Sequence, residues 1–206
     1  YNDVIGNKVI NFPNYSHIGQ LERCIVGSQP MWRVALHTEN NFWFDDKYEV
    51  CGDHEFELKI SEKYRIQHLS IPLGTFYKSL ARSNKEFENP DRTRKEVTEL
   101  TTLYLNRYIN NCTEKEIVEI QNKYEANTLL PILLYELLKR IEKILYPDIY
   151  PKYFFHSIEF IYFLNIMVYE KKGEINKCLK LCKRFLRYKK SERINQKYLQ
   201  LNSKEL

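Results

Sequence analysis

The chain has 206 residues, of which 43% are hydrophobic and 14% aromatic, so it is long and apolar enough to bury a core. This composition excludes disordered, collagen-like and disulfide-dense classes of protein. Lys and Arg number 32 against 27 Asp and Glu, which leaves a net charge of +5. The five cysteines are odd in number and have no framework spacing, which indicates a reducing, intracellular compartment, cytoplasmic or nuclear.

The N-terminal part of the chain carries short alternations of apolar and polar residues that are typical of β-strands. Glu55–Ile60 is the clearest case, because its charged and apolar residues alternate without exception. Met31–His37 and Asn41–Asp46 flank a polar turn and predict a β-hairpin. The other expected strands are Val4–Phe12, Arg23–Val26, Tyr48–Cys51 and Tyr64–Ile71. Together they predict a small antiparallel β sandwich or a partly open barrel.

Further along the chain the pattern changes to a helical one. Asn89 and Pro90 suit the N-cap and the first residue of a helix that ends near Asn111. Thr113 and Glu116 form a capping box that opens a helix to about Tyr124. Three more helices complete a bundle of about five: Leu129–Leu145 with Thr128 as its cap, Lys152–Tyr169, and, after a turn at Gly173, Glu174–Tyr198.

These patterns predict an α+β protein with two modules. The β-rich module covers residues 1–82, a polar link covers 83–89, the α-helical module with its basic last helix covers 90–200, and a tail covers 201–206. The most apolar stretch, Tyr153–Tyr169, is shorter than the roughly 20 residues of a membrane span. It also contains His156 and Glu159, so we expect a buried helix and no transmembrane segment.

Two pairs of side chains have metal-ligand spacing. Cys51 with His54, and Cys178 with Cys182, could together supply four ligands to zinc. However, the second pair lies on an apolar helix stripe, where free cysteines pack without a metal. We therefore predict no metal and no cofactor.

Other candidates for catalysis have a structural interpretation that is simpler. Asp45 and Asp46 are typical turn formers, Glu55 and Glu57 suit the solvated face of a strand, and His156 with Glu159 suits a buried polar pair. The chain contains no nucleophile motif and no glycine-rich phosphate loop. We expect no catalysis, and a metal-dependent enzyme that uses Cys51, His54 and the Asp pair is the less favoured alternative.

The expected hairpin is rich in aromatic residues. Trp32 lies in its first strand, and Phe42, Trp43 and Phe44 lie in its second. Alternation cannot place Trp43 and both of its neighbours on one buried face. An outward-facing Trp43 would stack on a nucleobase or anchor a partner protein, unless a loop or the helical module covers it.

The positive charge is concentrated in the last expected helix. Residues 171–206 hold 12 Lys and Arg against 3 Asp and Glu, whereas residues 1–170 hold 20 against 24. At 100° per residue, an apolar arc is formed by Ile175, Cys178, Leu179, Cys182, Phe185 and Leu186. The opposite arc is formed by Lys177, Lys180, Lys183, Arg184, Arg187 and Lys190. Six like charges repel one another, and an anionic partner would relieve that repulsion.

Phosphate backbones, acidic protein surfaces and anionic lipid headgroups are all suitable partners for this arc, and a lysine-rich solvated helix is the alternative without a partner. We predict a non-catalytic structural or adaptor subunit of a larger intracellular assembly. It would bind other protein subunits through Trp32, Trp43 and the basic arc. The alternative is a nucleic-acid-binding protein, in which the β barrel stacks bases and residues 171–197 bind the phosphates of DNA or RNA.

Overall fold

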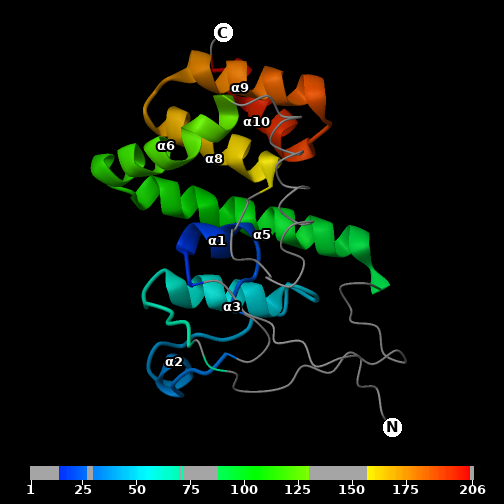
Figure 1. The fold of residues 1–206 in the computed structure, drawn as a ribbon. Helices are drawn as coiled ribbons and strands as arrows, with labels where there is room; N and C mark the ends of the chain where they lie inside the picture. The colour runs from blue at the N-terminus through cyan, green and yellow to red at the C-terminus, as the bar shows by residue number, and fades with distance from the viewer. Residues whose placement is uncertain (1–13, 27–29, 70, 72–87, 130–156, 205–206) are drawn as a thin grey trace. The chain divides into compact units, whose positions relative to one another are not determined.

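A computed structural model of the chain describes residues 14–26, 30–69, 71, 88–129 and 157–204, and the regular structure within these ranges is helical (Figure 1). The chain divides into two compact units, residues 1–102 with 148–154, and residues 103–147 with 155–206. Helix α5 (Pro90–Asn111) contributes its first part to the first unit and its last part to the second. None of the helices in the described ranges has the length and hydropathy that a membrane span requires.

The predicted β sandwich or barrel is wrong, because no β-strand occurs in the part of the chain that the structure describes. The clearest expected strand, Glu55–Ile60, lies inside helix α3 (Gly52–Ser61). The alternation of charged and apolar residues does not separate an exposed face from a buried one. Glu55 and Glu57 are buried, as are the apolar residues of this stretch. Glu, Leu and Lys also favour a helix over a strand, and this propensity was the signal available in the sequence.

The expected hairpin is replaced by a single helical turn and irregular chain. Helix α2 (Ala35–Thr38) occupies the end of the first expected strand. The chain then reverses at Asn41, whose φ of 52° lies in the left-handed region that Asn tolerates. Three more expected strands are also absent from the described residues: Arg23–Val26, Tyr48–Cys51 and Tyr64–Ile71. Every residue that the structure describes in these ranges is a turn, a bend or irregular chain. Val4–Phe12 lies outside the described residues.

The first unit is built around α3. Helix α1 (His17–Glu22) begins at Ser16, whose hydroxyl accepts a hydrogen bond from the backbone N–H of Gly19, and it packs against α3. On another side of α3, Phe56 and Ile60 form an apolar cluster with Phe42. The buried surface of α3 therefore comes from residues on several of its sides, as is typical of a central helix.

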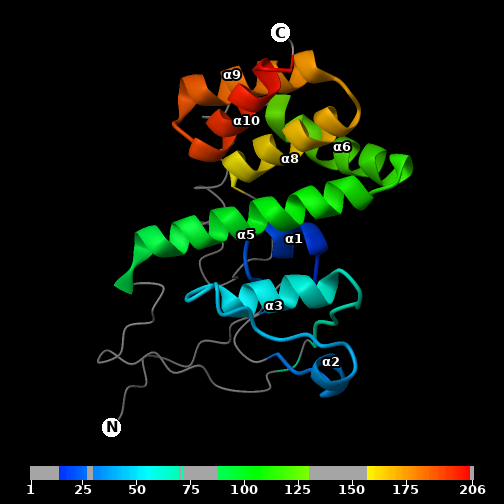
Figure 2. The same ribbon diagram turned by 180° about the vertical axis from the view of Figure 1, so that it is seen from behind.

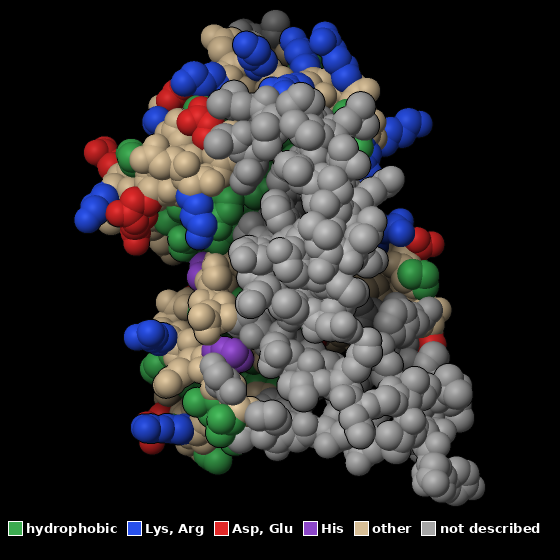
Figure 3. All heavy atoms as spheres, in the orientation of Figure 1, with side chains coloured by type: hydrophobic (Ala, Val, Ile, Leu, Met, Phe, Trp, Pro, Cys, Tyr) green, Lys and Arg blue, Asp and Glu red, His purple; other side chains and the backbone are tan. Residues whose placement is uncertain are grey.

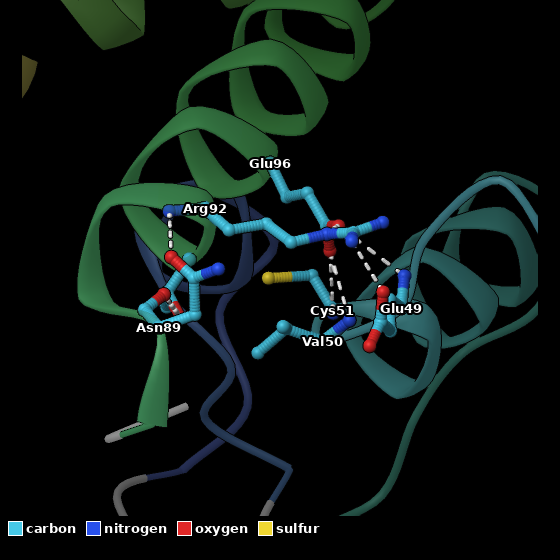
Figure 4. Close-up of polar contacts among 7 residues, drawn as sticks. Glu49, Val50, Cys51, Asn89, Arg92 and Glu96 are labelled. Atoms are coloured by element: carbon cyan, nitrogen blue, oxygen red, sulfur yellow. Dashed lines mark hydrogen bonds and ion pairs between the residues drawn. The ribbon is translucent and has the colours of Figure 1, made fainter. Parts of the chain in front are cut away.

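A carboxylate from α5 holds the turn that leads into α3 (Figure 4). The buried side chain of Glu96 accepts hydrogen bonds from the backbone N–H groups of Glu49, Val50 and Cys51, at N···O distances of 3.3, 2.9 and 3.2 Å. Arg92, one turn earlier on α5, donates from Nε to the same carboxylate at 2.9 Å and forms an ion pair with Glu49. Three successive N–H groups that converge on one anion make a concave anion site, and here the chain fills it itself.

The second unit consists of the end of α5 with α6 (Glu114–Leu129), α8 (Ile158–Lys171), α9 (Ile175–Tyr188) and α10 (Glu192–Asn202). Helix α8 is buried along most of its length, packing against α6 and α9, and α9 packs against α10 (Figures 1 and 2). Within α8, the amide of Asn165 donates to the carbonyl groups of Tyr124 and Ile161 at 3.3 and 2.9 Å. The NH2 group of this buried side chain therefore has two acceptors, whereas its Oδ1 has no hydrogen-bond partner among the described residues.

The helix-capping predictions hold at the start of α5 and of α6. The side chain of Asn89 accepts from the N–H of Arg92 at 3.1 Å, and Thr113 and Glu116 exchange the two bonds of a capping box. Helix α6 runs beyond the expected end, so Thr128 lies within it and is no N-cap. The expected helix Leu129–Leu145 otherwise lies outside the described residues.

The expected last helix Glu174–Tyr198 is two helices, and the prediction of one continuous helix is wrong. The turn at Gly173 is confirmed, with a φ of 75° that favours glycine. Helix α9 ends at Tyr188, where Lys189 adopts an extended conformation, and Ser191 then caps α10 by accepting from the N–H of Ile194 at 3.2 Å. Because Ser is a favoured N-cap residue, Ser191 was the signal for this break.

Candidate binding surfaces

Helix α9 presents a basic face opposite its buried side. Cys178, Leu179, Cys182 and Phe185 are buried, and Phe185 packs on Tyr162 of α8 with ring centroids 5.3 Å apart. The predicted division of this helix into an apolar arc and a basic arc is therefore confirmed. The basic face, as we call it below, comprises six exposed residues: Lys177, Lys180, Lys183, Arg184, Arg187 and, just beyond the helix, Lys190.

The charge of the basic face is only partly compensated within the chain. Lys177 forms an ion pair with Glu174 at 2.5 Å, and its ammonium lies 5.0 Å from the ring centroid of Tyr169. Among the described residues, no carboxylate lies within ion-pair distance of Lys180, Lys183 or Arg187. Lys180, Lys183 and Arg187 therefore present exposed positive charge without a counter-charge among the described residues.

The surface is hollowed along this face. A hollow of about 480 Å³ is lined, among the described residues, by Asn176, Leu179, Lys180, Lys183, Arg184 and Arg187. In the space-filling view, Lys and Arg side chains gather over α9 (Figure 3). Four cationic groups, one amide and one aliphatic side chain suit an anionic ligand that also has an apolar part.

The first unit carries an aromatic cluster, which we define as Trp32, His37, Trp43, Phe44 and Phe56. His37 lies between Trp43 and Phe56, with ring centroids 4.5 and 5.5 Å away, and Phe44 stacks on Phe56 at 4.4 Å. Trp32 meets Phe56 at 5.2 Å and at a steep angle. Phe56 is buried, whereas Trp32, Trp43 and Phe44 are 40%, 55% and 51% exposed. Of the two alternatives that the sequence left open for Trp43, outward-facing or covered, the described residues leave it outward-facing.

Both indole N–H groups of the cluster are occupied within the chain. Trp32 Nε1 donates to His37 Nε2 at 2.9 Å, and Trp43 Nε1 donates to the side-chain oxygen of Asn41 at 3.0 Å. Since Nε2 of His37 accepts, the ring proton resides on Nδ1, which donates to the carbonyl oxygen of Phe42 at 2.6 Å. The outer surfaces of the two indoles therefore offer stacking and apolar contact, and no hydrogen-bond donor.

A buried polar network between α1 and α3 was missed in the sequence. Glu57 accepts hydrogen bonds from Gln20 Nε2 at 2.8 Å and from Cys24 Sγ at 3.1 Å, and burial raises the pKa of Glu57 to about 7. His54 Nε2 lies 2.6 Å from the carbonyl oxygen of Gln20, and burial lowers the pKa of this histidine. The prediction that Glu57 and Glu55 form a solvated strand face is wrong, because both belong to a helix that is covered on most sides.

The other predicted candidates are separately engaged. No group of three or more His, Cys, Asp and Glu side chains is placed to hold a metal ion in the described ranges. Cys178 Sγ lies 3.4 Å from the carbonyl oxygen of Ile166, and Asp45 accepts from the N–H of Lys47 at 3.0 Å in a turn. Glu159 binds Ser191 and Arg193, whereas His156 lies outside the described residues.

The structure thus gathers the six predicted cationic residues on one face and the two predicted tryptophans in one cluster, each within its own unit. Comparison with protein-family models, with curated protein sequences and with solved structures finds no match. The basic face and the aromatic cluster are therefore the features on which a functional proposal rests.

Proposed function

We propose that this protein is a non-catalytic adaptor subunit of a larger assembly, which binds an anionic surface of a partner through the basic face of α9. The observation that supports this proposal is the one-sided charge of that face, where Lys180, Lys183 and Arg187 have no carboxylate within ion-pair distance among the described residues. The opposite side of α9 is buried in the second unit, so the helix cannot rotate and its cations remain together on one exposed face. A partner of opposite charge relieves their repulsion and speeds association.

The aromatic cluster supports a second point of attachment. Trp32, Trp43 and Phe44 expose large apolar areas next to one another, and Met31 and Val34 nearby in the chain are 74% and 69% exposed. Contiguous exposed apolar patches of this kind mark protein–protein interaction sites, and Trp is enriched among the residues that dominate binding energy. An adaptor needs two separate attachment sites, and the two surfaces that we propose for this role belong to different units.

Nucleic acid is the second candidate partner of the basic face. The observation in its favour is the exposed pair Arg184 and Arg187, because guanidinium groups form bidentate contacts with phosphate oxygens. The predicted barrel, which was to stack the bases, is absent from the described residues. For this reason we place the adaptor function first.

Affinity purification with the full chain as bait tests the proposal. We would compare the wild type with the double variant K180E/R187E and with a matched control, K95E/K115E, which reverses two exposed lysines on α5 and α6. Each purification would be run with and without nuclease, followed by mass spectrometry. We expect K180E/R187E to lose one set of proteins that the wild type and the control retain, with no effect of nuclease. Capture that is the same for all three baits contradicts the proposal, and loss on nuclease treatment assigns the basic face to nucleic acid.

A further inference from the structure

We propose that the element that binds the basic face is an acidic amphipathic α-helix, which lies along α9 and places one apolar side chain in the hollow beside Leu179. This inference rests on the proposed adaptor function and specifies its partner. It is carried by the spacing of the cations, by the mixed chemistry of the hollow and by the number of cations on α9 that have no described counter-charge.

The cations of α9 recur once per helical turn. Lys180, Lys183 and Arg187 follow one another at intervals of three and four residues, which corresponds to a rise of about 5 Å per step. A second α-helix with Asp or Glu at intervals of three and four residues presents carboxylates with the same rise. Two helices that cross at a small angle of about 20° keep this match over three or four turns. Pairing of charges along two helices in this manner is the device that sets partner choice in coiled coils.

The hollow contains more than positive charge. Leu179 and Asn176 line it together with the cations, and no aromatic side chain lines it among the described residues. A phosphate backbone offers no apolar group that could contact Leu179. The bases of a nucleic acid would find no aromatic side chain on which to stack among the described residues of the hollow. One face of an amphipathic helix offers both carboxylates and a Leu, Ile or Phe side chain, in the helix-in-groove mode of recognition.

The uncompensated part of the basic face is short. Lys177 is already paired with Glu174, and within α9 the exposed cations without a described carboxylate are Lys180, Lys183 and Arg187, which span about 10 Å. A helix with three carboxylates offers one counter-charge to each of these three cations.

Fluorescence anisotropy with the full chain and a labelled synthetic peptide tests the inference. The probe is a helical peptide of about four turns that carries three glutamates at successive i, i+3 or i+4 positions and one leucine beside them. Its control has glutamine in place of each glutamate. We expect the wild type to bind the acidic peptide roughly tenfold more tightly than the control peptide, because each exposed charge pair contributes modestly and three act together.

Charge exchange makes the test specific to the proposed pairing. K180E/R187E should bind the acidic peptide roughly tenfold more weakly than the wild type, and a peptide with three lysines should bind this variant better than it binds the wild type. K95E/K115E should bind as the wild type does. Asn176→Asp, which places a carboxylate in the hollow at an exposed position, should weaken the acidic peptide and spare the control peptide.

Three outcomes overturn the inference. They are equal binding of the acidic and control peptides, failure of the lysine peptide to rescue K180E/R187E, and binding of a DNA or RNA oligonucleotide that depends on Lys180 and Arg187 while the acidic peptide does not bind. If affinity purification shows capture that depends on the basic face but the acidic peptide does not bind, the inferred acidic helix is wrong and the adaptor function stands. If that capture is independent of the basic face, the adaptor function itself fails.

Discussion

Glu57 is a carboxyl group held at the packing surface between α1 and α3. Burial raises its pKa to about 7, although the hydrogen bonds from Cys24 and Gln20 act in the opposite direction. In an unfolded chain the pKa of glutamate is about 4.3. Between these two values the folded chain keeps the proton and the unfolded chain has lost it. The stability that this proton contributes is therefore complete below about pH 4 and is lost as the pH rises to about 7.

Glu57→Gln should remove this pH dependence, because glutamine resembles the protonated side chain and can still accept from Gln20 and Cys24. As the pH rises from 5 to 8, we expect the free energy of unfolding of the variant to increase relative to that of the wild type, by on the order of 2 kcal/mol. Urea unfolding of both proteins at the two pH values measures it.

The difference between variant and wild type is the quantity to follow. His17 and His54 have pKa values lowered by burial, so they reduce stability as the pH falls below about 6.5 and mask the wild-type trend. Glu119→Gln, at an exposed position on α6, is the matched control and should show no such difference. A pH profile of Glu57→Gln that runs parallel to that of the wild type would show that Glu57 titrates normally.

Residues at helix ends were predictable, whereas buried polar residues were not. Asn89, Thr113 and Glu116 act through contacts with backbone groups three residues away, so a short stretch of sequence contains the whole interaction. The partners of Glu57 lie 37 and 33 residues away in the chain. No local pattern records such contacts, and a charged residue with unknown partners was therefore assigned to the surface.

At the scale of elements, Glu96 connects α5 to the turn before α3. Burial opposes its ionisation, but the hydrogen bonds from Arg92 and from the backbone of Val50, Cys51 and Glu49 outweigh this and lower its pKa. Its stabilising contribution is thus present above the pKa of an unfolded glutamate and is lost as the pH falls below that value.

Glu96→Ala should destabilise the first unit by about 2 kcal/mol near neutral pH, because it leaves the backbone N–H groups of Val50 and Cys51 without their acceptor. Glu99→Ala, on the same helix, removes an exposed ion pair with Lys47 and should cost far less stability than Glu96→Ala, because solvent screens exposed charge pairs. Chemical unfolding monitored by tryptophan fluorescence reports on this unit, which contains both tryptophans. Equal losses for the two variants would mean that Glu96 does not hold the turn.

The helix α9 and the helix α3 show where pattern-based prediction works for elements. Only one side of α9 is buried, so its apolar and basic arcs were readable at a period of 3.6 residues. Helix α3 is covered on most sides and includes buried glutamates, so its periodicity is lost and a period of two appears by coincidence. Amphipathic surface helices are therefore predictable from sequence, whereas a central helix with paired polar groups is not.

At the scale of the whole molecule, the net charge of +5 is the sum of two unlike parts. Residues 171–206 supply all of the excess, and the structure places the largest group of their cations on the basic face of α9. The candidate site was thus predictable as a set of residues, because charge and helical period are both local properties. The hollow, with Asn176 and Leu179 in its lining, was not predictable because it depends on how the second unit packs.

Lysine footprinting of the complex tests most directly whether a partner covers the basic face. The full chain, alone and bound to the partner recovered by affinity purification, would be acetylated briefly and the modified lysines quantified by mass spectrometry. We predict strong protection of Lys180 and Lys183 in the complex, and unchanged modification of the exposed Lys95 and Lys115. Modification of Lys180 and Lys183 at the same rate in the free and bound protein would contradict the proposal that α9 is the binding surface.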